Sequence, residues 1–280
     1  MWTALFPTWK HFKFYFFTLD AEKILKKLES EPFEIKCIKR SPSHKNFILK
    51  FFSESSPSLF LKAFIPRLFK KNRIKNYFKA FKTLKNLNVS LLDPIFLFWG
   101  SPQIAFLKKE PFYGGIVFPY IEKGFLKRKN LFLDDKKENV NSRLIKNLIF
   151  FLFELHEKGI YLKDTKFNNF YYSSEENFKI FDLDGIKFYK RPLSKLERLK
   201  DISTLAMSLE WEKIANARTL VFEIYKELFP ELREKDFERF SQLVEKKRKK
   251  REKALSFKAF KKKLKNNFWF LFLKDKFYNS

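Results

Sequence analysis

The spacing of hydrophobic residues changes near residue 120, and this change limits the chain to few fold classes. Before it, besides helical patterns at 20–30 and 72–87, short runs have the two-residue period of strands. These runs lie at 33–40, 47–52, 59–64, 95–100, 103–110 and 115–121. After it, helical spacing dominates at 141–159, 195–211, 216–229 and 235–266, with short strands at 169–172 and 178–184. The pattern predicts an α+β fold of two lobes: an antiparallel sheet with one inserted helix, then a mainly helical lobe.

Three segments follow from this division. We expect an N-lobe over residues 1–118, a C-lobe over 119–245 and a basic aromatic tail over 246–280. From Glu245 to Ser280 the chain has 14 Lys and Arg residues against three acids, a surplus of +11. Such a tail suits a solvated face, nucleic acid or an anionic membrane surface, and the neighbouring Phe, Trp and Leu residues favour the membrane.

Composition excludes several classes of protein. A single cysteine, Cys37, rules out a disulfide framework and a cysteine-based zinc site, and three scattered histidines make a metallohydrolase a poor fit. The six glycines spell neither a dinucleotide-binding nor a P-loop motif. No apolar run approaches the roughly 18 residues that cross a bilayer, and charged residues interrupt the aromatic N-terminus, which we do not interpret as a secretory signal.

The chain is strongly basic, since 59 Lys and Arg residues against 32 acids give a formal charge of +27. At 45% hydrophobic residues the chain has enough apolar material for a packed core despite this charge. A charge of this size predicts a negatively charged partner, which is nucleic acid, an anionic membrane or a polyanionic substrate. Charge alone does not choose among them.

Three polar side chains follow the apolar helix predicted at 141–159. Asp164 lies in a polar loop, Asn169 five positions later, and Asp182 thirteen further on at the end of an apolar strand. Phosphoryl transfer needs one carboxylate to orient the attacking hydroxyl and accept its proton, while a second carboxylate and an amide oxygen hold Mg²⁺. The ordered set therefore indicates phosphoryl transfer more strongly than any of its members alone.

With these residues the chain resembles the protein-kinase-like superfamily. YLKDTKFNN (161–169) matches the catalytic loop at Asp164 and Asn169, and DLDG (182–185) matches the metal-binding motif. Residues 182–209 look most like the lipopolysaccharide core kinases, which phosphorylate Kdo or heptose on the lipid A core. The resemblance implies Asp201 as a brace of the catalytic loop, and Lys62, in LFLKAF, as the lysine that contacts the nucleotide phosphates.

The resemblance implies ATP and Mg²⁺ as cofactors and assigns roles. Asp164 is expected to accept the hydroxyl proton, Lys166 to touch the transferred phosphate, and Asn169 and Asp182 to hold the metal. DLDG has two carboxylates, and Asp184 is the alternative ligand. The implied acceptor is a lipid A-core saccharide, with the protein peripheral on the cytoplasmic face of the inner membrane.

The front half departs from the superfamily pattern in two places. No acidic residue occurs between Ser55 and Leu92, so the helix glutamate that usually pairs with the lysine is missing, and Tyr77 falls about where it would stand. Lys62 is then held less well unless Asp184 or another acid substitutes. KRSPSHKN (39–46) has no glycine to cover the phosphates. These departures keep two alternatives open: an atypical protein kinase or small-molecule phosphotransferase, and a pseudokinase or basic nucleic-acid-binding module.

Overall fold

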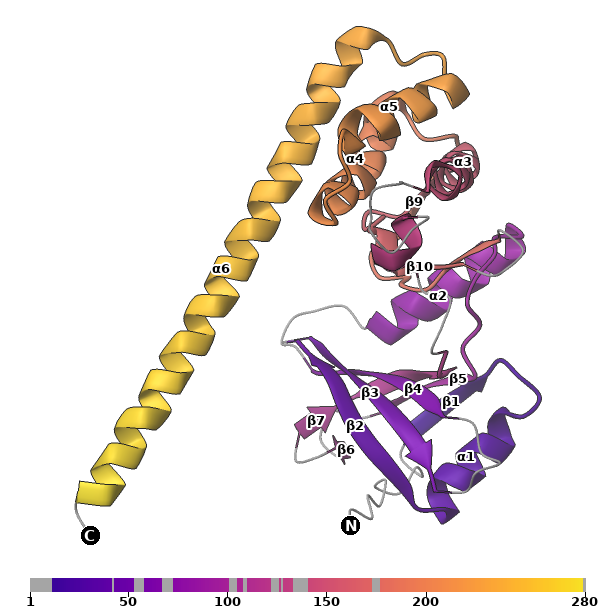
Figure 1. Cartoon of the computed structure of the whole chain (residues 1–280). Coiled ribbons are helices and arrows are strands. Elements are labelled where there is room, and N and C mark those ends of the chain that lie inside the picture. The colour runs from indigo at the N-terminus through magenta and orange to yellow at the C-terminus, as the bar shows by residue number, and fades with distance from the viewer. Residues whose placement is uncertain are drawn as a thin grey trace. The chain divides into compact units, whose positions relative to one another are not determined.

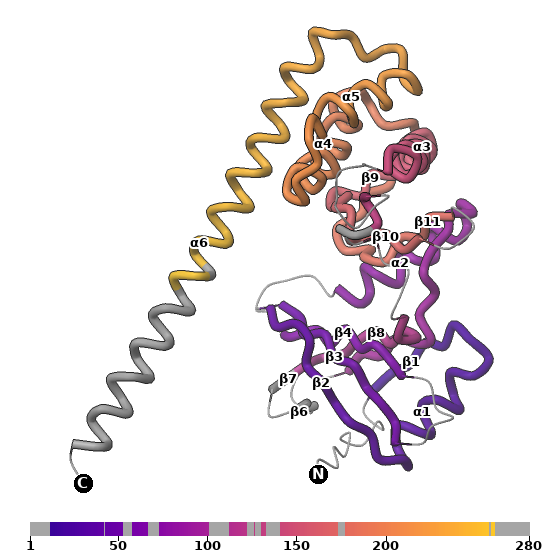
Figure 2. Tube along the Cα trace, in the orientation of Figure 1, coloured from indigo at the N-terminus to yellow at the C-terminus, as the bar shows by residue number. Residues whose placement is uncertain are grey.

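The structure, a computed structural model, describes residues 12–41, 43–52, 58–66, 73–100, 105–107, 110–121, 126, 128–132, 141–172 and 177–278 (Figures 1 and 2). The chain forms two compact units. The first comprises Met1–Leu126 and Asn169–Asp184, and the second comprises Lys127–Asn168 and Gly185–Ser280. The boundaries expected at 118/119 and 245/246 stay predictions. The expected α+β class, with an antiparallel sheet in the front half and helices in the back half, is confirmed.

A six-stranded antiparallel sheet is the centre of the first unit (Figure 1). Its strands run in the order β1-β5-β8-β4-β3-β2, with each neighbouring pair antiparallel. Their bounds are Phe12–Phe16 (β1), Phe33–Arg40 (β2), His44–Phe51 (β3), Leu59–Phe64 (β4), Phe96–Gly100 (β5) and Gly114–Pro119 (β8). Two small hairpins accompany it: β6 (Ala105–Leu107) with β7 (Glu110–Phe112), and β10 (Phe170–Tyr172) with β11 (Phe178–Ile180).

The alternation of side chains along β4 divides the sheet into two faces. Leu59, Leu61 and Ala63 join the hydrophobic core that helix α1 (Ala21–Ser30) covers through Ala21 and Leu28. Successive strand residues point to opposite faces, so Phe60, Lys62 and Phe64 lie on the other face. All but one of the six β4 residues are buried, which means that this strand is covered on both sides.

Helix α2 (Arg73–Asn86) follows the strand that carries Lys62. Its buried residues follow helical spacing: Ile74, Tyr77, Ala80, Phe81 and Leu84. The Tyr77 ring lies 6.5 Å from that of Phe118 on β8. This confirms the helix predicted at 72–87.

Sequence spacing alone missed one strand of the sheet. Strand β1 pairs with β5 along its whole length, from Phe12 opposite Gly100 to Phe16 opposite Phe96. Phe12 belongs to the core, and Phe14 and Phe16 pack against it. An aromatic segment near the N-terminus is thus an edge strand, while residues 1–11 lie outside the described part of the chain. The strand expected at 103–110 is divided between β6 and β7.

The second unit is mainly helical. Its helices are α3 (Ser142–Glu157), α4 (Lys195–Trp211), α5 (Ala217–Leu228) and α6 (Glu234–Tyr278), with η2 (Arg128–Leu131) before them. Strands β9 (Ile160–Tyr161) and β12 (Lys187–Phe188) pair with each other, and a 3-10 turn, η3, covers Phe167–Asn169. The ends of α3 match the sequence, since Asn141 accepts a 3.0 Å hydrogen bond from Leu144 N and Gly159 adopts φ +71°.

Helix α6 is one continuous element of 45 residues, longer than the segment 235–266 that spacing predicts. Near its middle it packs on α4: Arg251 lies 4.3 Å from the Trp211 ring, and Lys247 donates to Lys200 O at 2.7 Å. Burial lowers the pKa of Lys247 to about 8, although Asp201 and Asp164 oppose this shift. No helix in the described part of the chain has the length and apolarity needed to cross a bilayer.

Candidate functional site: a lysine–aspartate cluster and a braced loop

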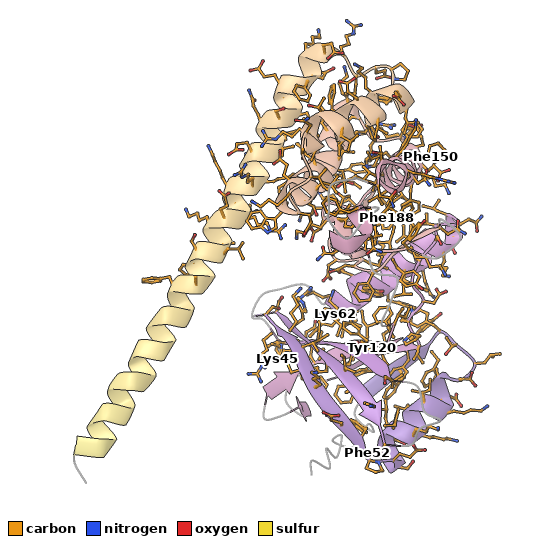
Figure 3. The ribbon with its side chains drawn as sticks, viewed as in Figure 1. Lys45, Phe52, Lys62, Tyr120, Phe150 and Phe188 are labelled. Carbon is orange, nitrogen blue, oxygen red and sulfur yellow. The ribbon has the colours of Figure 1, made fainter. Side chains whose placement is uncertain are left out.

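Lys62 is a buried lysine in the centre of the first unit's sheet (Figure 3). Its side chain is 5% exposed, and its register partner on β3 is Asn46. A buried ammonium is stable only if it is paired and hydrogen-bonded, because removing an ion from water is costly. Lys62 therefore needs an acidic partner. No acidic residue occurs between Ser55 and Leu92, so the partner must come from a distant part of the chain.

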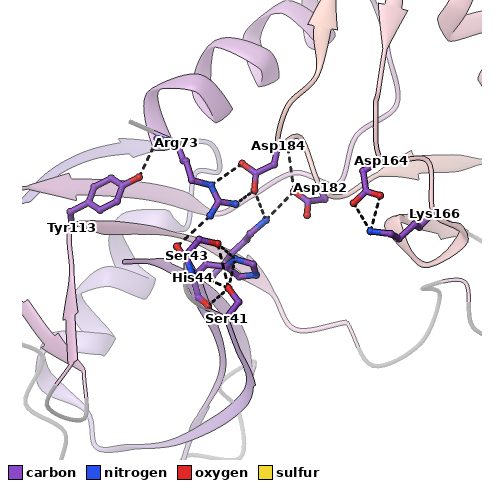
Figure 4. A network of polar contacts seen from close by, with 10 residues as sticks. Ser41, Ser43, His44, Arg73, Tyr113, Asp164, Lys166, Asp182 and Asp184 are labelled. Atoms are coloured by element: carbon purple, nitrogen blue, oxygen red, sulfur yellow. Dashed lines mark hydrogen bonds and ion pairs between the residues drawn. The ribbon is translucent and has the colours of Figure 1, made fainter. Parts of the chain in front are cut away.

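The acids come from the segment that follows β11 (Figure 4). Lys62 Nζ lies 2.9 Å from Asp182 Oδ1 and 3.3 Å from Asp184 Oδ2. The Asp184 backbone N–H also donates to Asp182 Oδ1, at 3.2 Å. Two predicted site residues, Lys62 and Asp182, are therefore brought together, along with the alternative ligand Asp184.

Arg73, the first residue of α2, completes the cluster and is a residue that sequence reasoning missed. Its guanidinium binds Asp184 through two nitrogens, Nε to Oδ1 at 3.4 Å and Nη2 to Oδ2. Its Nη1 donates to Ser43 O at 3.3 Å, and its backbone N–H donates to the Tyr113 hydroxyl at 3.1 Å. The only signal for it in the sequence is an arginine at the start of a helix that has no acid.

The cations of the cluster lower the pKa of Asp182. Burial raises the pKa of Asp182, but the charge and hydrogen bond of Lys62, the Asp184 N–H and Arg73 outweigh burial and hold it below its ordinary value. The side chains of Asp182 and Asp184 keep 30% and 25% of their surface exposed. Both side chains are therefore partly in contact with solvent.

Tyr77 falls about where the helix glutamate would stand. Tyr77 is buried, and its hydroxyl has no hydrogen-bond partner within the described ranges; the same holds for Asn46 Oδ1. Burial raises the pKa of Tyr77 well above its usual value, and Asp182 and Asp184 add to this shift. Tyr77 therefore stays neutral and does not replace the glutamate as a partner for Lys62.

The turn between β2 and β3 lies beside this cluster (Figure 4). His44 Nδ1 is 2.9 Å from Ser41 Oγ and 3.2 Å from Ser43 Oγ. Burial, Lys62, Arg73 and Lys39 lower the pKa of His44 to about 4, against an opposing effect of Asp182. His44 is consequently neutral at pH 7, and the turn offers hydroxyl groups rather than glycine backbone.

Asp164 and Lys166, the two predicted catalytic residues, lie in the second unit. Lys166 Nζ lies 2.8 Å from Asp164 Oδ1 and 2.9 Å from Asp164 Oδ2, so the ammonium contacts both carboxylate oxygens (Figure 4). The Asp164 side chain is 44% exposed and that of Lys166 35%. A partly exposed carboxylate beside a lysine suits a base that must receive a proton from a bound hydroxyl.

The loop that carries Asp164 is held by Asp201 of α4. The fully buried Asp201 carboxylate accepts from Leu162 N at 3.0 Å and from Lys163 N at 2.8 Å. His156 Nε2 lies 3.2 Å from the same carboxylate, and Thr165 Oγ1 donates to Asp201 O at 2.6 Å. His156 is thus a buried partner of the brace.

Backbone strain adjoins Asp164. Lys163 has φ +71°, a left-handed conformation that L-residues adopt at a cost of the order of 1–3 kcal/mol. Its N–H is one of the two bonded to Asp201, which holds the strained residue in place. Strained residues cluster at active sites, and this one sits directly before the candidate base.

Asn169, the remaining predicted metal ligand, ends η3 in the first unit, where its backbone carbonyl accepts from Phe181 N at 3.2 Å. Carboxylate and amide oxygens are the ligands that Mg²⁺ prefers, so Asp182 and Asn169 fit the ion in their chemistry. In the described ranges no cluster of three or more His, Cys, Asp or Glu side chains forms a metal site. The predicted convergence of residues 164, 169 and 182 stays a prediction, because Asp164 belongs to the other unit.

The first unit places the buried lysine on a central strand of an antiparallel sheet, with a helix after that strand and an aspartate motif bonded to the lysine. No protein-family model matches the chain, and no curated protein does. Among solved structures, the chain is similar to a crystal structure of a Stt7 homolog from Micromonas algae soaked with ATP. The two are 12% identical, the match covers 69% of each chain, and the TM-score is 0.41.

Proposed function

We propose that this protein is an ATP- and Mg²⁺-dependent kinase that phosphorylates a sugar, Kdo or heptose, of the lipopolysaccharide inner core. The observation that carries the proposal is the ion pair between the buried Lys62 and the partly exposed Asp182, residues 120 positions apart in the chain. Burying a charged side chain is costly unless the charge is paired. Here the pair consists of a lysine and an aspartate, the two groups that phosphoryl transfer places beside the nucleotide phosphates.

The proposed reaction assigns a step to each group. The Asp164 carboxylate orients the acceptor hydroxyl and takes its proton as the new O–P bond forms and the bond between the γ-phosphorus and the ADP oxygen breaks. Lys166 offsets negative charge on the transferred phosphoryl group, and Lys62 contacts the α and β phosphates. Asn169 and Asp182 would hold Mg²⁺, which neutralises phosphate charge when bound.

The charge of the chain supports the choice of acceptor. A lipid A core carries phosphates and carboxylates, and a chain with a formal charge of +27 attracts such a polyanion. Helix α6 contains the basic run 246–253 and, directly after it, the exposed residues Leu255, Phe257 and Phe260. Basic and exposed apolar residues on one helix favour binding at an anionic membrane surface, and we propose the cytoplasmic face of the inner membrane.

The test compares phosphate transfer from ATP to a Kdo-lipid A acceptor by the wild type and by Asp164→Asn. We expect a loss of at least about 100-fold, the usual contribution of a positioned base. Circular dichroism and the affinity for Mg·ATP are expected to stay unchanged. Asp93→Asn is the matched control, since Asp93 forms an exposed pair with Lys85 at 2.7 Å and its loss is expected to leave transfer intact. Equal turnover by Asp164→Asn would refute the assigned role.

Other acceptors in the same assay distinguish the alternatives. Transfer to protein acceptors or free sugars, with none to Kdo-lipid A, would identify an atypical protein kinase or a small-molecule phosphotransferase. A failure to bind Mg·ATP, combined with nucleic-acid binding that weakens steeply with salt, would identify a pseudokinase or nucleic-acid-binding module, because phosphate contacts release counterions.

A further inference from the structure

Lys62 has no acidic partner on the helix that follows its strand. The charged residues of α2 are all basic: Arg73, Lys75, Lys79, Lys82 and Lys85. In the kinase-like arrangement the strand lysine and a helix glutamate form the ion pair that holds the lysine toward the phosphates. Here Asp182 and Asp184 both contact Lys62, so one of them must take over that task if the other is to bind a metal.

The two aspartates differ in how many of their oxygens are engaged. Asp184 uses both: Oδ1 binds Arg73 Nε, and Oδ2 binds both Lys62 and Arg73 Nη2. Asp182 uses one, because Lys62 Nζ and the Asp184 N–H both donate to Oδ1. Its Oδ2 accepts no hydrogen bond from the residues that the structure describes. Asp182 therefore has an oxygen available for a cation, while Asp184 is enclosed by two cationic side chains.

Arg73 is itself fixed from several sides. Its guanidinium lies 4.7 Å from the centre of the Phe64 ring and donates to Ser43 O in the β2–β3 turn. Its backbone N–H is tied to the Tyr113 hydroxyl. A planar guanidinium bonded to a carboxylate through two nitrogens restrains that carboxylate in orientation as well as position. Helix α2 thus holds Asp184 through the Arg73 guanidinium, whereas in the kinase-like arrangement this helix supplies a glutamate.

We infer that Asp184 is the acid that holds Lys62 in place of the absent helix glutamate, that Arg73 positions Asp184, and that Asp182 keeps its second oxygen for the divalent cation. The inference deepens the proposed function and rests on it for the role of the cation. In this arrangement α2 contributes a positive charge, Arg73, where the kinase-like arrangement has a glutamate. Both acids come from the aspartate motif.

The first experiment needs no ligand. Full-length protein is acylated with an amine-reactive ester, and the labelling rate of Lys62 is followed by mass spectrometry. Lys23, whose side chain is 81% exposed, is the reference in the same sample. An ammonium that is enclosed and hydrogen-bonded reacts slowly. We expect labelling of Lys62 to rise at least fivefold in Asp184→Asn, about threefold in Arg73→Gln, and less than twofold in Asp182→Asn. Arg73→Lys, which keeps the charge, is expected to lie between the wild type and Arg73→Gln.

The opposite order would overturn the inference. If Asp182→Asn accelerates labelling as much as Asp184→Asn or more, Asp182 holds the lysine and Asp184 has no separate role. If Arg73→Gln leaves the rate unchanged while Asp184→Asn raises it, Arg73 is not a positioning residue. Asp93→Asn controls for the loss of a surface acid, since it removes the partner of Lys85 and is expected to leave Lys62 unaffected.

The second experiment measures ATP affinity by calorimetry with and without Mg²⁺. We expect Asp182→Asn to abolish the gain in affinity that Mg²⁺ gives, and Asp184→Asn and Arg73→Gln to keep that gain while both affinities fall. Loss of the gain in Asp184→Asn alone would overturn the assignment of the two aspartates. A wild type that binds no ATP would refute the proposed function, and the labelling order would then decide by itself whether Asp184 and Arg73 hold Lys62.

Discussion

In the first unit four charged side chains satisfy one another, whereas in the second a single carboxylate is satisfied largely by backbone. Lys62 and Arg73 contact Asp182 and Asp184, and both acids are partly exposed. Asp201 is fully buried and accepts two backbone N–H bonds beside His156. Ion pairs open to solvent can exchange partners with a ligand, while a buried carboxylate bonded to backbone fixes a loop. The first unit thus has charged side chains that a ligand from solvent can reach, and the second holds the Asp164 loop in one geometry.

The largest expected effect tests whether the buried Asp201 carboxylate holds the Asp164 loop. Asp201→Ala removes the acceptor of the buried Leu162 N–H and of the partly buried Lys163 N–H and leaves both donors unsatisfied. We expect a loss of about 3–5 kcal/mol in the free energy of unfolding. Urea denaturation followed by circular dichroism measures it. Asp182→Ala is the comparison variant from the exchangeable cluster, and a greater loss there than in Asp201→Ala would contradict the contrast.

Lys62→Met tests whether the ion pairs around Lys62 can exchange partners with a ligand. Charge-assisted hydrogen bonds to phosphate contribute about 1.5–3 kcal/mol, so the affinity for Mg·ATP is expected to fall by about 10- to 100-fold. Stability is expected to fall by about 1–3 kcal/mol, because methionine leaves the partly exposed Asp182 carboxylate without its ammonium partner. Calorimetric titration and urea denaturation check the two parts. A large loss of stability with unchanged affinity would make the cluster structural.

The pH dependence of stability reports on the burial of His44 and on the cations around it. The pKa of His44 is about 4 in the folded chain and about 6.5 when unfolded, so between these values the unfolded state binds more protons. The contribution of neutral His44 is complete above pH 6.5 and is lost as the pH falls toward 4. We expect the wild type to lose about 1–2 kcal/mol more than His44→Gln over this range. Parallel pH profiles in both proteins would contradict the placement of His44 beside Lys62 and Arg73.

The smallest expected effect concerns Tyr77. Its buried hydroxyl has no partner among the described residues, so Tyr77→Phe removes a desolvated polar group while keeping the ring. We expect a gain of about 1 kcal/mol in the free energy of unfolding, with ATP affinity unchanged. Thermal and urea denaturation of the purified variant measure the change. A clear loss of stability would show that the hydroxyl is hydrogen-bonded after all.

Local signals in the sequence account for most of the elements. Apolar spacing predicts α1, α2 and the ends of α3 to within a few residues, and the predicted helix 195–211 coincides with α4. Strand β1 was not predicted, because a run of aromatic residues interrupted by lysines has no clear strand boundary. Its pairing with β5 also depends on residues 80 to 88 positions away. Spacing within a motif also predicts Asp164, Asn169 and Asp182 as site residues. The family resemblance predicts Asp201 as a brace, and its hydrogen bonds with Leu162 N and Lys163 N agree with that role.

What the sequence by itself determined is the order of helices and strands and the motif residues, since both arise from short-range spacing. Only the tertiary structure decided which acid meets Lys62, because Asp182 and Asp184 lie more than a hundred positions away and no local pattern encodes that pairing. It also revealed Arg73, which in sequence is one of 59 Lys and Arg residues. Burial distinguishes them: a charge taken out of water must find its partner in space, whatever its distance along the chain.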